Sequence, residues 1–263
     1  MTLFDVHCFS DALGLTISFY VLLPQGTTRQ TGMSGGERRE QYATLYLLHG
    51  LSDDHTAWLR RTSIERYAEG KNLAVVKPAV ARSYYQDMAA GPGYWSFVSE
   101  ELPALCRGWF PLSAAREENY AAGLSMGGYG AMRLGLACAG KFAAVASFSG
   151  ALDLRNLERN LGGNDLAISR AEWAAIFGAP GAAGTSADLF VLAERSACSG
   201  APMPRIFLSC GTEDYLLDGN RAFHRHLEKL GVEHTYEESP GAHEWGYWDA
   251  QIRRALAWLP LRG

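Results

Sequence analysis

The stretch NYAAGLSMGGYGAM, residues 119–132, places Ser125 between two glycines in a Gly-x-Ser-x-Gly pattern. A short apolar run leads into Gly123, and the residues after Ser125 can form a helix. Small residues two positions before and after the serine let neighbouring backbone pass close to a sharp strand-to-helix turn. The stretch therefore predicts an α/β fold with Ser125 in a strained turn. A phosphate-binding turn is disfavoured, because the glycines at 127–130 stand on the wrong side of the serine.

The same pattern occurs a second time, at residues 32–36, with Ser34 at its centre. Ser34 lies inside a polar, glycine-rich segment, residues 24–41, which predicts a surface connection. No apolar strand leads into Ser34, and no helix-forming run follows it. We therefore interpret Ser34 as a loop serine and Ser125 as the serine that carries chemistry.

Short apolar runs occur on both sides of Ser125 and alternate with helix-forming stretches. They predict the buried strands of a mainly parallel, twisted sheet. These runs are residues 14–23, 43–48, 73–78, 120–123, 143–150 and 205–210. Strands that alternate with helices imply right-handed crossovers, with helices on both faces of the sheet. Residues 151–203 are too many for a plain connection and predict a small cap insertion with helices of its own.

Length and composition indicate one globular domain, residues 1–263, with a large core. Charged residues make up 20% of the chain and the net charge is −4, without a basic run, which argues against nucleic acid or an anionic membrane as a partner. No stretch approaches the ~18 apolar residues of a membrane span, and the first residues show no signal-peptide pattern. Five cysteines without paired spacing predict reduced thiols and a cytoplasmic protein.

A serine hydroxyl becomes a strong nucleophile only when a positioned base takes its proton. Where a serine occupies such a turn, the acid and then the histidine follow it in the chain. His224 and His226 lie in a predicted amphipathic helix and are expected in solvent, and His234 lies within a strand-like run. His243 follows that run, in a loop before the last helix, where it can reach the carboxyl edge of the sheet. We therefore predict His243 as the base for Ser125.

The acid is expected just after the strand at residues 205–210. Glu213, Asp214 and Asp218 are the carboxylates that follow this strand. The turn Gly-Thr-Glu-Asp places Asp214 just beyond the strand end, whereas Glu213 projects the other way and Asp218 helps to open the next helix. We therefore predict that Asp214 holds the imidazole of His243 in the required tautomer.

Two backbone N–H groups are predicted to bind the carbonyl oxygen on which negative charge develops. They belong to Leu51, in the turn after a buried strand, and to Met126, next to the serine. Losing one such donor typically costs about 2.7–4 kcal/mol of transition-state stabilisation. Asp53, Asp54 and His55 could instead bind a metal, but their spacing matches no strong metal-binding pattern. We predict turn and capping roles for these carboxylates, and no metal.

Several stretches together resemble the esterase D (Putative esterase) family of α/β-hydrolases, from about residue 40 to the end. These stretches are LYLLHGLSDDHTAWLRRTSIERYAEG, EELPAL with WFP, AGLSMGGYGAM, SFSGALD, CGTEDYL and GAHEWGYW. The resemblance implies an α/β-hydrolase fold without a cofactor, in which Ser125, Asp214 and His243 form the triad and Leu51 and Met126 are the oxyanion donors. The family includes S-formylglutathione hydrolases, feruloyl esterases, mycolyltransferases and bacterial tributyrin and acetyl esterases. The spacing is most similar to the small tributyrin-type esterases.

The resemblance implies a serine carboxylesterase that acts on short-chain acyl esters through an acyl-enzyme. A thioesterase of the S-formylglutathione type is the nearest alternative. The sequence has no basic cluster clearly placed for the carboxylates of glutathione, and Lys77 and Arg82 are the basic residues that could lie near them. A non-catalytic binding module is disfavoured because all three triad residues are present, and a peptidase because a large specificity domain has no room. The expected partner is a small-molecule ester, and the sequence is compatible with a homo-oligomer. Segments 24–41 and 151–203 match no family pattern, so they leave the choice of substrate open.

Six aromatic residues are candidates for an ester pocket. They are Trp58, Tyr84, Tyr85, Trp95, Trp173 and Trp245. Most aromatic residues in a chain of this kind belong to the core, so we expect two or three of these six to line the site.

Overall fold

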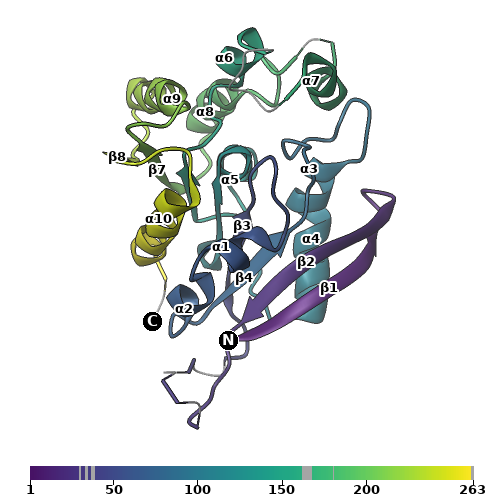
Figure 1. The fold of residues 1–263 in the computed structure, drawn as a ribbon, viewed down its shortest axis with the longest axis vertical. Coiled ribbons are helices and arrows are strands. Elements are labelled where there is room, and N and C mark those ends of the chain that lie inside the picture. Colours follow the sequence, from purple (N-terminus) through teal and green to yellow (C-terminus); the bar gives the residue numbers. More distant parts are fainter. Residues whose placement is uncertain (30, 33–34, 37–38, 162–167, 180, 262–263) are drawn as a thin grey trace.

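The computed structural model describes residues 1–29, 31–32, 35–36, 39–161, 168–179 and 181–261. They form an eight-stranded sheet with the order β1-β2-β4-β3-β5-β6-β7-β8 (Figure 1). The strands are β1 (Thr2–Ser10), β2 (Leu15–Leu23), β3 (Ala43–Leu48), β4 (Leu73–Pro78), β5 (Asn119–Leu124), β6 (Ala144–Phe148), β7 (Arg205–Gly211) and β8 (Thr235–Ser239). The α-helices are α1 (Ala57–Arg61), α2 (Ile64–Ala68), α3 (Tyr94–Ser96), α4 (Leu102–Trp109), α5 (Met126–Ala137), α6 (Leu154–Arg159), α7 (Arg170–Phe177), α8 (Leu189–Cys198), α9 (Leu217–Lys229) and α10 (Trp245–Trp258). A π-helical turn, η1 (Phe97–Glu101), joins α3 to α4, and a short 3-10 helix, η2 (Arg116–Glu118), precedes β5.

The sheet is mainly parallel, as the alternation of strands and helices predicts. β4, β3, β5, β6, β7 and β8 run parallel to one another, and β2 runs antiparallel to both of its neighbours. In β3, Leu45 and Leu47 pack into one buried cluster, whereas Tyr46 and Leu48 pack into the other. This continuous apolar pattern is typical of a strand that is covered on both faces.

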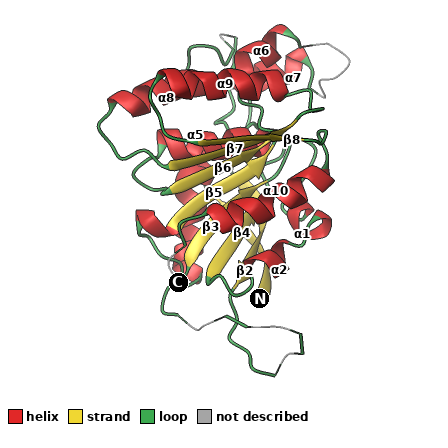
Figure 2. Cartoon of the chain, turned by 90° about the vertical axis from the view of Figure 1, so that its left-hand side faces the viewer, coloured by secondary structure: helices red, strands yellow, loops and turns green. Residues whose placement is uncertain are grey.

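Two groups of helices cover the two faces of the sheet (Figure 2). α1, α2 and α10 contribute buried side chains to one core, together with one set of strand residues. α4, α5, α8 and α9 contribute to the other core. The arrangement is an α/β-hydrolase fold, and its carboxyl sheet edge carries the turn that follows β5.

Residues 151–203 leave the sheet after β6 and return to it at β7. Their described part contains α6, α7 and α8, in line with the prediction of helices within this segment. α8 packs against α5 and α9, so it covers a sheet face as a crossover helix does. α6 and α7 instead lie beyond the carboxyl edge of the strands (Figures 1 and 2). The overhanging part is therefore shorter than the predicted cap of 151–203, because α8 belongs to the layer of helices.

Segment 24–41 connects β2 to β3 at the other end of the molecule. Its two arms meet where the N–H of Gly36 donates a hydrogen bond to the carbonyl of Gln25, at 2.9 Å. The segment precedes β3, whereas Ser125 follows the parallel neighbour β5, so the two lie at opposite sheet edges. Ser34 itself lies outside the described residues.

The sequence pattern does not predict strand β1. Asp5 and His7 interrupt its apolar residues, because β1 forms the exposed end of the sheet and pairs with β2. Among the described residues, no helix combines the length and the apolar character needed to cross a membrane.

Candidate active site

Ser125 occupies a strained turn between β5 and α5. Its backbone has φ 53° and ψ −119°, a conformation that side-chain-bearing residues rarely adopt. Its N–H donates to the carbonyl of Phe148, and its own carbonyl accepts from the N–H groups of Tyr129 and Ala151. These three hydrogen bonds hold the turn against its strain.

The two glycines of the pattern are required because backbone passes close to both of them. A Cβ on Gly123 would lie 2.3 Å from the carbonyl oxygen of Gly127, and one on Gly127 would lie 2.4 Å from the carbonyl oxygen of Leu48. Neither backbone oxygen can move without displacing a strand or the helix. The Gly-x-Ser-x-Gly spacing therefore follows from the packing of β5, β3 and α5.

Gly127→Ala is expected to lower the free energy of unfolding by about 1–3 kcal/mol or more, because the added methyl group overlaps fixed backbone. Urea unfolding followed by circular dichroism measures the change. Gly246→Ala is the matched control, since a Cβ there has no neighbouring atom within 4 Å. That helical substitution is expected to stabilise the protein by roughly 0.5–1 kcal/mol. Equal stabilities of the two variants would contradict the packing argument.

The structure brings Ser125, His243 and Asp214 together. His243 Nε2 lies 3.0 Å from Ser125 Oγ, and His243 Nδ1 lies 2.8 Å from Asp214 Oδ2. The Asp214 side chain is fully buried, and its other oxygen accepts from the N–H of Leu216. The carboxylate accepts from Nδ1–H, so Nε2 is left to accept the hydroxyl proton. Each of the three residues follows a strand of the sheet, at its carboxyl edge or in the loop beyond β8.

The other two carboxylates near Asp214 have different partners. Glu213 accepts a hydrogen bond from the N–H of Gly241, at 2.6 Å, and thus fixes the loop that leads to His243. Asp218 lies in the first turn of α9. Two aromatic rings pack against the imidazole of His243. The distance between ring centroids is 4.6 Å for Tyr215 and 4.9 Å for Trp248.

The expectation that His224 and His226 lie free in solvent is wrong. Both are half-buried, because α9 packs against α8 and β7. His224 Nδ1 lies 2.7 Å from His234 Nε2, and His226 Nε2 lies 3.2 Å from the carbonyl of Phe190. None of the three histidines lines the cavity at Ser125.

The N–H groups of Leu51 and Met126 are the two predicted oxyanion donors. Within the described part of the chain, neither donates to a protein acceptor. Met126 begins α5, so its N–H stands at the positive end of a twelve-residue helix. Leu51 lines the same cavity as Ser125.

His49 fixes the turn that carries Leu51, a role that the sequence pattern does not reveal. Its Nε2 accepts from the N–H of Val80 at 3.0 Å, so its Nδ1 carries the proton and donates to the carbonyl of Gly50 at 2.7 Å. The hydroxyl of Tyr85 donates to the carbonyl of His49. Complete burial lowers the pKa of His49 to about 4, so its imidazole stays neutral.

Because His49 is buried as a neutral imidazole, we expect it to make the stability of the fold sensitive to acid. An unfolded histidine takes up a proton near pH 6.5, about the ordinary value, whereas folded His49 stays neutral down to about pH 4. The unfolded chain therefore binds more protons between these values, and the free energy of unfolding falls by up to roughly 3 kcal/mol as the pH is lowered through them. His49→Gln should be less stable near neutral pH but lose less on acidification, measured by urea unfolding at both pH values. An unchanged slope in His49→Gln would refute the assignment.

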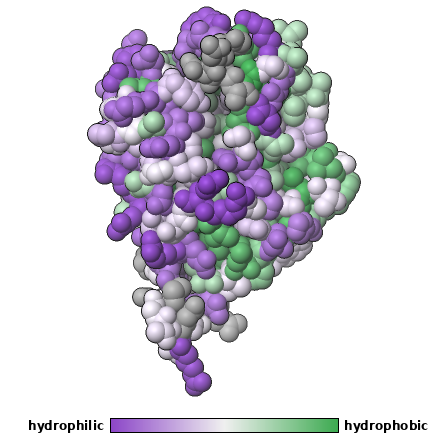
Figure 3. All heavy atoms as spheres, viewed as in Figure 1, coloured by the Kyte–Doolittle hydropathy of each residue, from purple (hydrophilic) through white to green (hydrophobic). Residues whose placement is uncertain are grey.

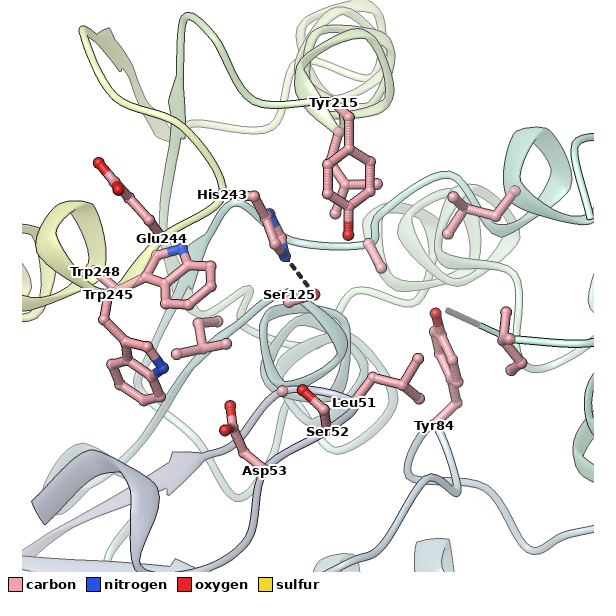
Figure 4. Close-up of a pocket in the computed structure, with 16 residues that line it drawn as sticks. Leu51, Ser52, Asp53, Tyr84, Ser125, Tyr215, His243, Glu244, Trp245 and Trp248 are labelled. Carbon is pink, nitrogen blue, oxygen red and sulfur yellow. Dashed lines mark hydrogen bonds between the residues drawn. The ribbon is translucent and has the colours of Figure 1, made fainter. Parts of the chain in front are cut away.

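A cavity of about 410 Å³ opens at Ser125 (Figure 4). It is lined by Gly50, Leu51, Ser52, Asp53, Tyr84, Leu124, Ser125, Ala151, Leu157, Ile168, Tyr215, Leu216, His243, Glu244, Trp245 and Trp248. Figure 4 shows the hydroxyl groups of Tyr84 and Tyr215 on one side of Ser125 and the two indoles on the other. Among the described lining residues there is no Lys or Arg, and burial raises the pKa of the Asp53 carboxyl. The cavity therefore suits an apolar, uncharged ligand.

Two of the six aromatic candidates, Tyr84 and Trp245, line this cavity. Trp173 does not, because it packs behind Tyr84, with 5.6 Å between the ring centroids. Trp95 does not either, because it lies under the guanidinium of Arg133, 3.9 Å from ring centroid to Cζ. Trp173 therefore packs within the cap and Trp95 packs against helix α5, so the prediction that they line the pocket was wrong.

The other two aromatic candidates are core residues. Trp58 is fully buried, and its indole N–H donates to the carbonyl of Leu48. Tyr85 is also fully buried, and its hydroxyl holds His49. Tyr215 and Trp248 are the aromatic residues at the cavity that the sequence prediction missed. Tyr215 directly follows Asp214, and Trp248 lies five residues after His243, so proximity in the chain to predicted triad residues was the signal that could have indicated them.

Three of the charged residues considered for other roles, Asp54, Lys77 and Arg82, do not line the cavity at Ser125. Asp54 accepts from the N–H and hydroxyl of Thr56, the predicted turn role. Lys77 is fully buried in β4, which lowers its pKa to about 8, and Arg82 pairs with Glu172. Neither cation lines the cavity at Ser125. No group of three or more potential metal ligands occurs within the described ranges.

Comparisons with known proteins agree with this geometry. The model of the family described as "Putative esterase" matches residues 10–259. The acetyl esterase of Caldicellulosiruptor saccharolyticus is 28% identical over 267 residues, which cover 98% of this chain and 98% of that protein. The fluorophosphonate-binding serine hydrolase F of Staphylococcus aureus superposes with a TM-score of 0.87 at 33% identity. An S-formylglutathione hydrolase from the same organism superposes with a TM-score of 0.84 at 33% identity, and each superposition covers 98% of both chains.

Proposed function

Because this chain belongs to the Putative esterase family and is a carboxylic ester hydrolase, we propose that it hydrolyses short-chain acyl esters with Ser125 as its nucleophile. The observation that carries the proposal is the hydrogen-bonded series from Ser125 through His243 to Asp214, at the wall of a cavity of about 410 Å³. The full-length similarity to an acetyl esterase supports a short acyl group.

In the first half of the reaction, Ser125 Oγ attacks the ester carbonyl carbon and passes its proton to His243 Nε2. The carbonyl oxygen becomes an oxyanion, which accepts hydrogen bonds from the N–H groups of Leu51 and Met126. Asp214 stabilises the imidazolium without taking its proton. When the tetrahedral intermediate collapses, the bond to the alcohol oxygen breaks, and His243 gives that oxygen its proton.

In the second half, water replaces the alcohol. His243 takes a proton from the water, whose oxygen attacks the acyl carbon bound to Ser125. Collapse of the second intermediate breaks the bond to Oγ, which regains its proton from His243 and releases the carboxylic acid.

The cavity is at the small end of the roughly 300–1,000 Å³ range of ligand pockets, at about 410 Å³. We therefore expect kcat/KM for p-nitrophenyl esters to be highest between acetyl and butyryl. Each further buried CH₂ would add about 0.8 kcal/mol of binding only if room existed for it. A kcat/KM that rises steadily from acetyl to decanoyl would refute the short acyl site.

Hydrolysis of S-formylglutathione is the second candidate, favoured by the 33% identity to a structure with that name. The charge of the cavity argues against it, since Asp53 and Glu244 are present and no lining residue among those described is Lys or Arg. The test compares S-formylglutathione with a neutral S-acyl thioester and an oxygen ester under the same conditions. A preference for S-formylglutathione over both neutral substrates would favour the thioesterase; the reverse order would favour the esterase.

A further inference from the structure

The outer edge of β1 is an unpartnered sheet edge. Within the described residues β1 pairs with β2 alone, so the N–H and C=O groups of its other side have no strand partner. Natural edge strands are usually protected by lysines, prolines or a covering element, because they otherwise template pairing with another chain. β1 has nine residues, Thr2–Ser10, and contains neither Lys nor Pro. It is therefore long enough and open enough to pair with another strand.

Large apolar side chains are exposed at both ends of β1. Leu3 is 43% exposed and Phe9 is 61% exposed, and Asp5 and His7 lie between them on the same face. Figure 3 shows hydrophobic side chains gathered over the β1–β2 hairpin, with hydrophilic ones between them. Exposed apolar area of this kind on a strand edge is typical of an interaction surface.

The order of these residues makes β1 complementary to itself. We propose that β1 pairs antiparallel with β1 of a second copy of this chain, around a two-fold axis at Val6. In this register Leu3 of each copy faces Phe9 of the other, and Asp5 faces His7. On the opposite face Phe4 lies across from Cys8. Both apolar pairs and both Asp5–His7 pairs, in which the carboxylate accepts a hydrogen bond from an imidazole N–H, therefore form at once, as cross-strand neighbours do in stable sheets.

The neighbouring registers lack this complementarity. A two-fold axis perpendicular to the sheet pairs only side chains that point to the same face of the sheet, so the axis must pass through a residue. Moving the axis to the next residue changes the partner of each residue by two positions. An axis at Asp5 would place the two Asp5 carboxylates opposite each other. An axis at His7 would place His7 opposite His7 and Asp5 opposite Phe9. The axis at Val6 is thus favoured over its neighbours by charge and by apolar contact.

The second face of β1 extends the proposed interface. Trp109, at the end of α4, is 50% exposed. Its indole stacks on Phe19, with 6.4 Å between ring centroids, and Phe19 is the β2 partner of Val6. Phe4 packs against Phe110 on the same side. A copy related by the axis at Val6 would cover these side chains and join the two sheets into one.

Sedimentation velocity over a wide range of protein concentration tests the proposal on the full chain. The wild type is expected to form a concentration-dependent dimer. Asp5→Lys combined with His7→Lys, and separately His7→Asp with Asp5 retained, should each raise the dimer dissociation constant by at least about tenfold through like charges. An equimolar mixture of these two variants should form a mixed dimer. The exchange Asp5→His with His7→Asp is the matched control and should dimerise like the wild type.

Ester hydrolysis should be unchanged in all these variants, since β1 is distant in the sheet from β5 and Ser125. This activity verifies folding and separates the result from the proposed function. A wild type that stays monomeric at high concentration would overturn the proposal. So would a dimer that persists in both like-charge variants, because its interface would then lie elsewhere.

Discussion

Ser125→Ala is expected to lower kcat for ester hydrolysis by on the order of 10⁴ to 10⁶. The substitution removes the Oγ that lies 3.0 Å from His243 Nε2, and with it the covalent route. The fold should persist, because alanine and serine place the same Cβ on the strained backbone at φ 53°. Activity on p-nitrophenyl butyrate and the thermal midpoint, measured on the same preparation, check both expectations.

The second Gly-x-Ser-x-Gly pattern supplies the matched control. Ser34→Ala should leave kcat unchanged, since segment 24–41 joins β3 at the sheet edge opposite the turn after β5. A serine-directed fluorophosphonate should add one label per chain, located at Ser125 by peptide mass analysis. Loss of activity or of labelling in Ser34→Ala, with Ser125→Ala active, would reverse the choice between the two serines.

The parts of the site that depend on local backbone could be predicted from the sequence. The turn at Ser125 needs a strand before it, a helix after it and glycines at fixed spacing, and all of these are contiguous in the chain. The strands at 43–48 and 73–78 were predicted with the bounds that the structure has, because both faces of each are buried and their apolar runs are continuous. Chain order then placed Asp214 and His243 at the same sheet edge.

The parts that depend on packing between distant segments could not be predicted. Trp58 and Tyr85 have the composition of pocket residues, yet they are buried in the core, where they hold the carbonyls of Leu48 and His49. The role of His49 rests on the N–H of Val80, which comes from the next strand connection. Contacts of this kind join residues that are far apart in the chain, so no spacing pattern in the sequence predicts them.

Strand β1 was missed for a different reason. The apolar runs that predict strands arise where both faces are buried, and β1 is exposed along one edge and one face. Its polar residues, Asp5 and His7, are those of an exposed edge. The polar residues that kept β1 from being predicted as a strand are the residues on which the proposed dimer rests.

Asp214→Asn is expected to fold normally and to lose on the order of 10³ to 10⁴ in kcat. The expectation follows the serine-protease case, in which the equivalent change costs about 10⁴. Asp214 is fully buried, and its Oδ2 accepts from His243 Nδ1 at 2.8 Å. An amide at this place cannot stabilise the imidazolium, and its NH₂ group can select the tautomer with the proton on Nε2. That tautomer cannot accept the proton of Ser125, so acylation slows while substrate binding is retained.

Two neighbouring carboxylates separate this role from a general effect of charge. Glu213→Gln should cost less than about tenfold in kcat, because a glutamine oxygen can still accept from the N–H of Gly241. Asp218→Asn should cost as little, since Asp218 lies in the first turn of α9, outside the proton path. All three substitutions remove one negative charge within five residues of one another, so a purely electrostatic effect on His243 would lower kcat in all of them. Steady-state kinetics with one ester decides between the two outcomes. If kcat collapsed in Glu213→Gln or Asp218→Asn and stayed near normal in Asp214→Asn, the triad acid would have to be assigned to another residue.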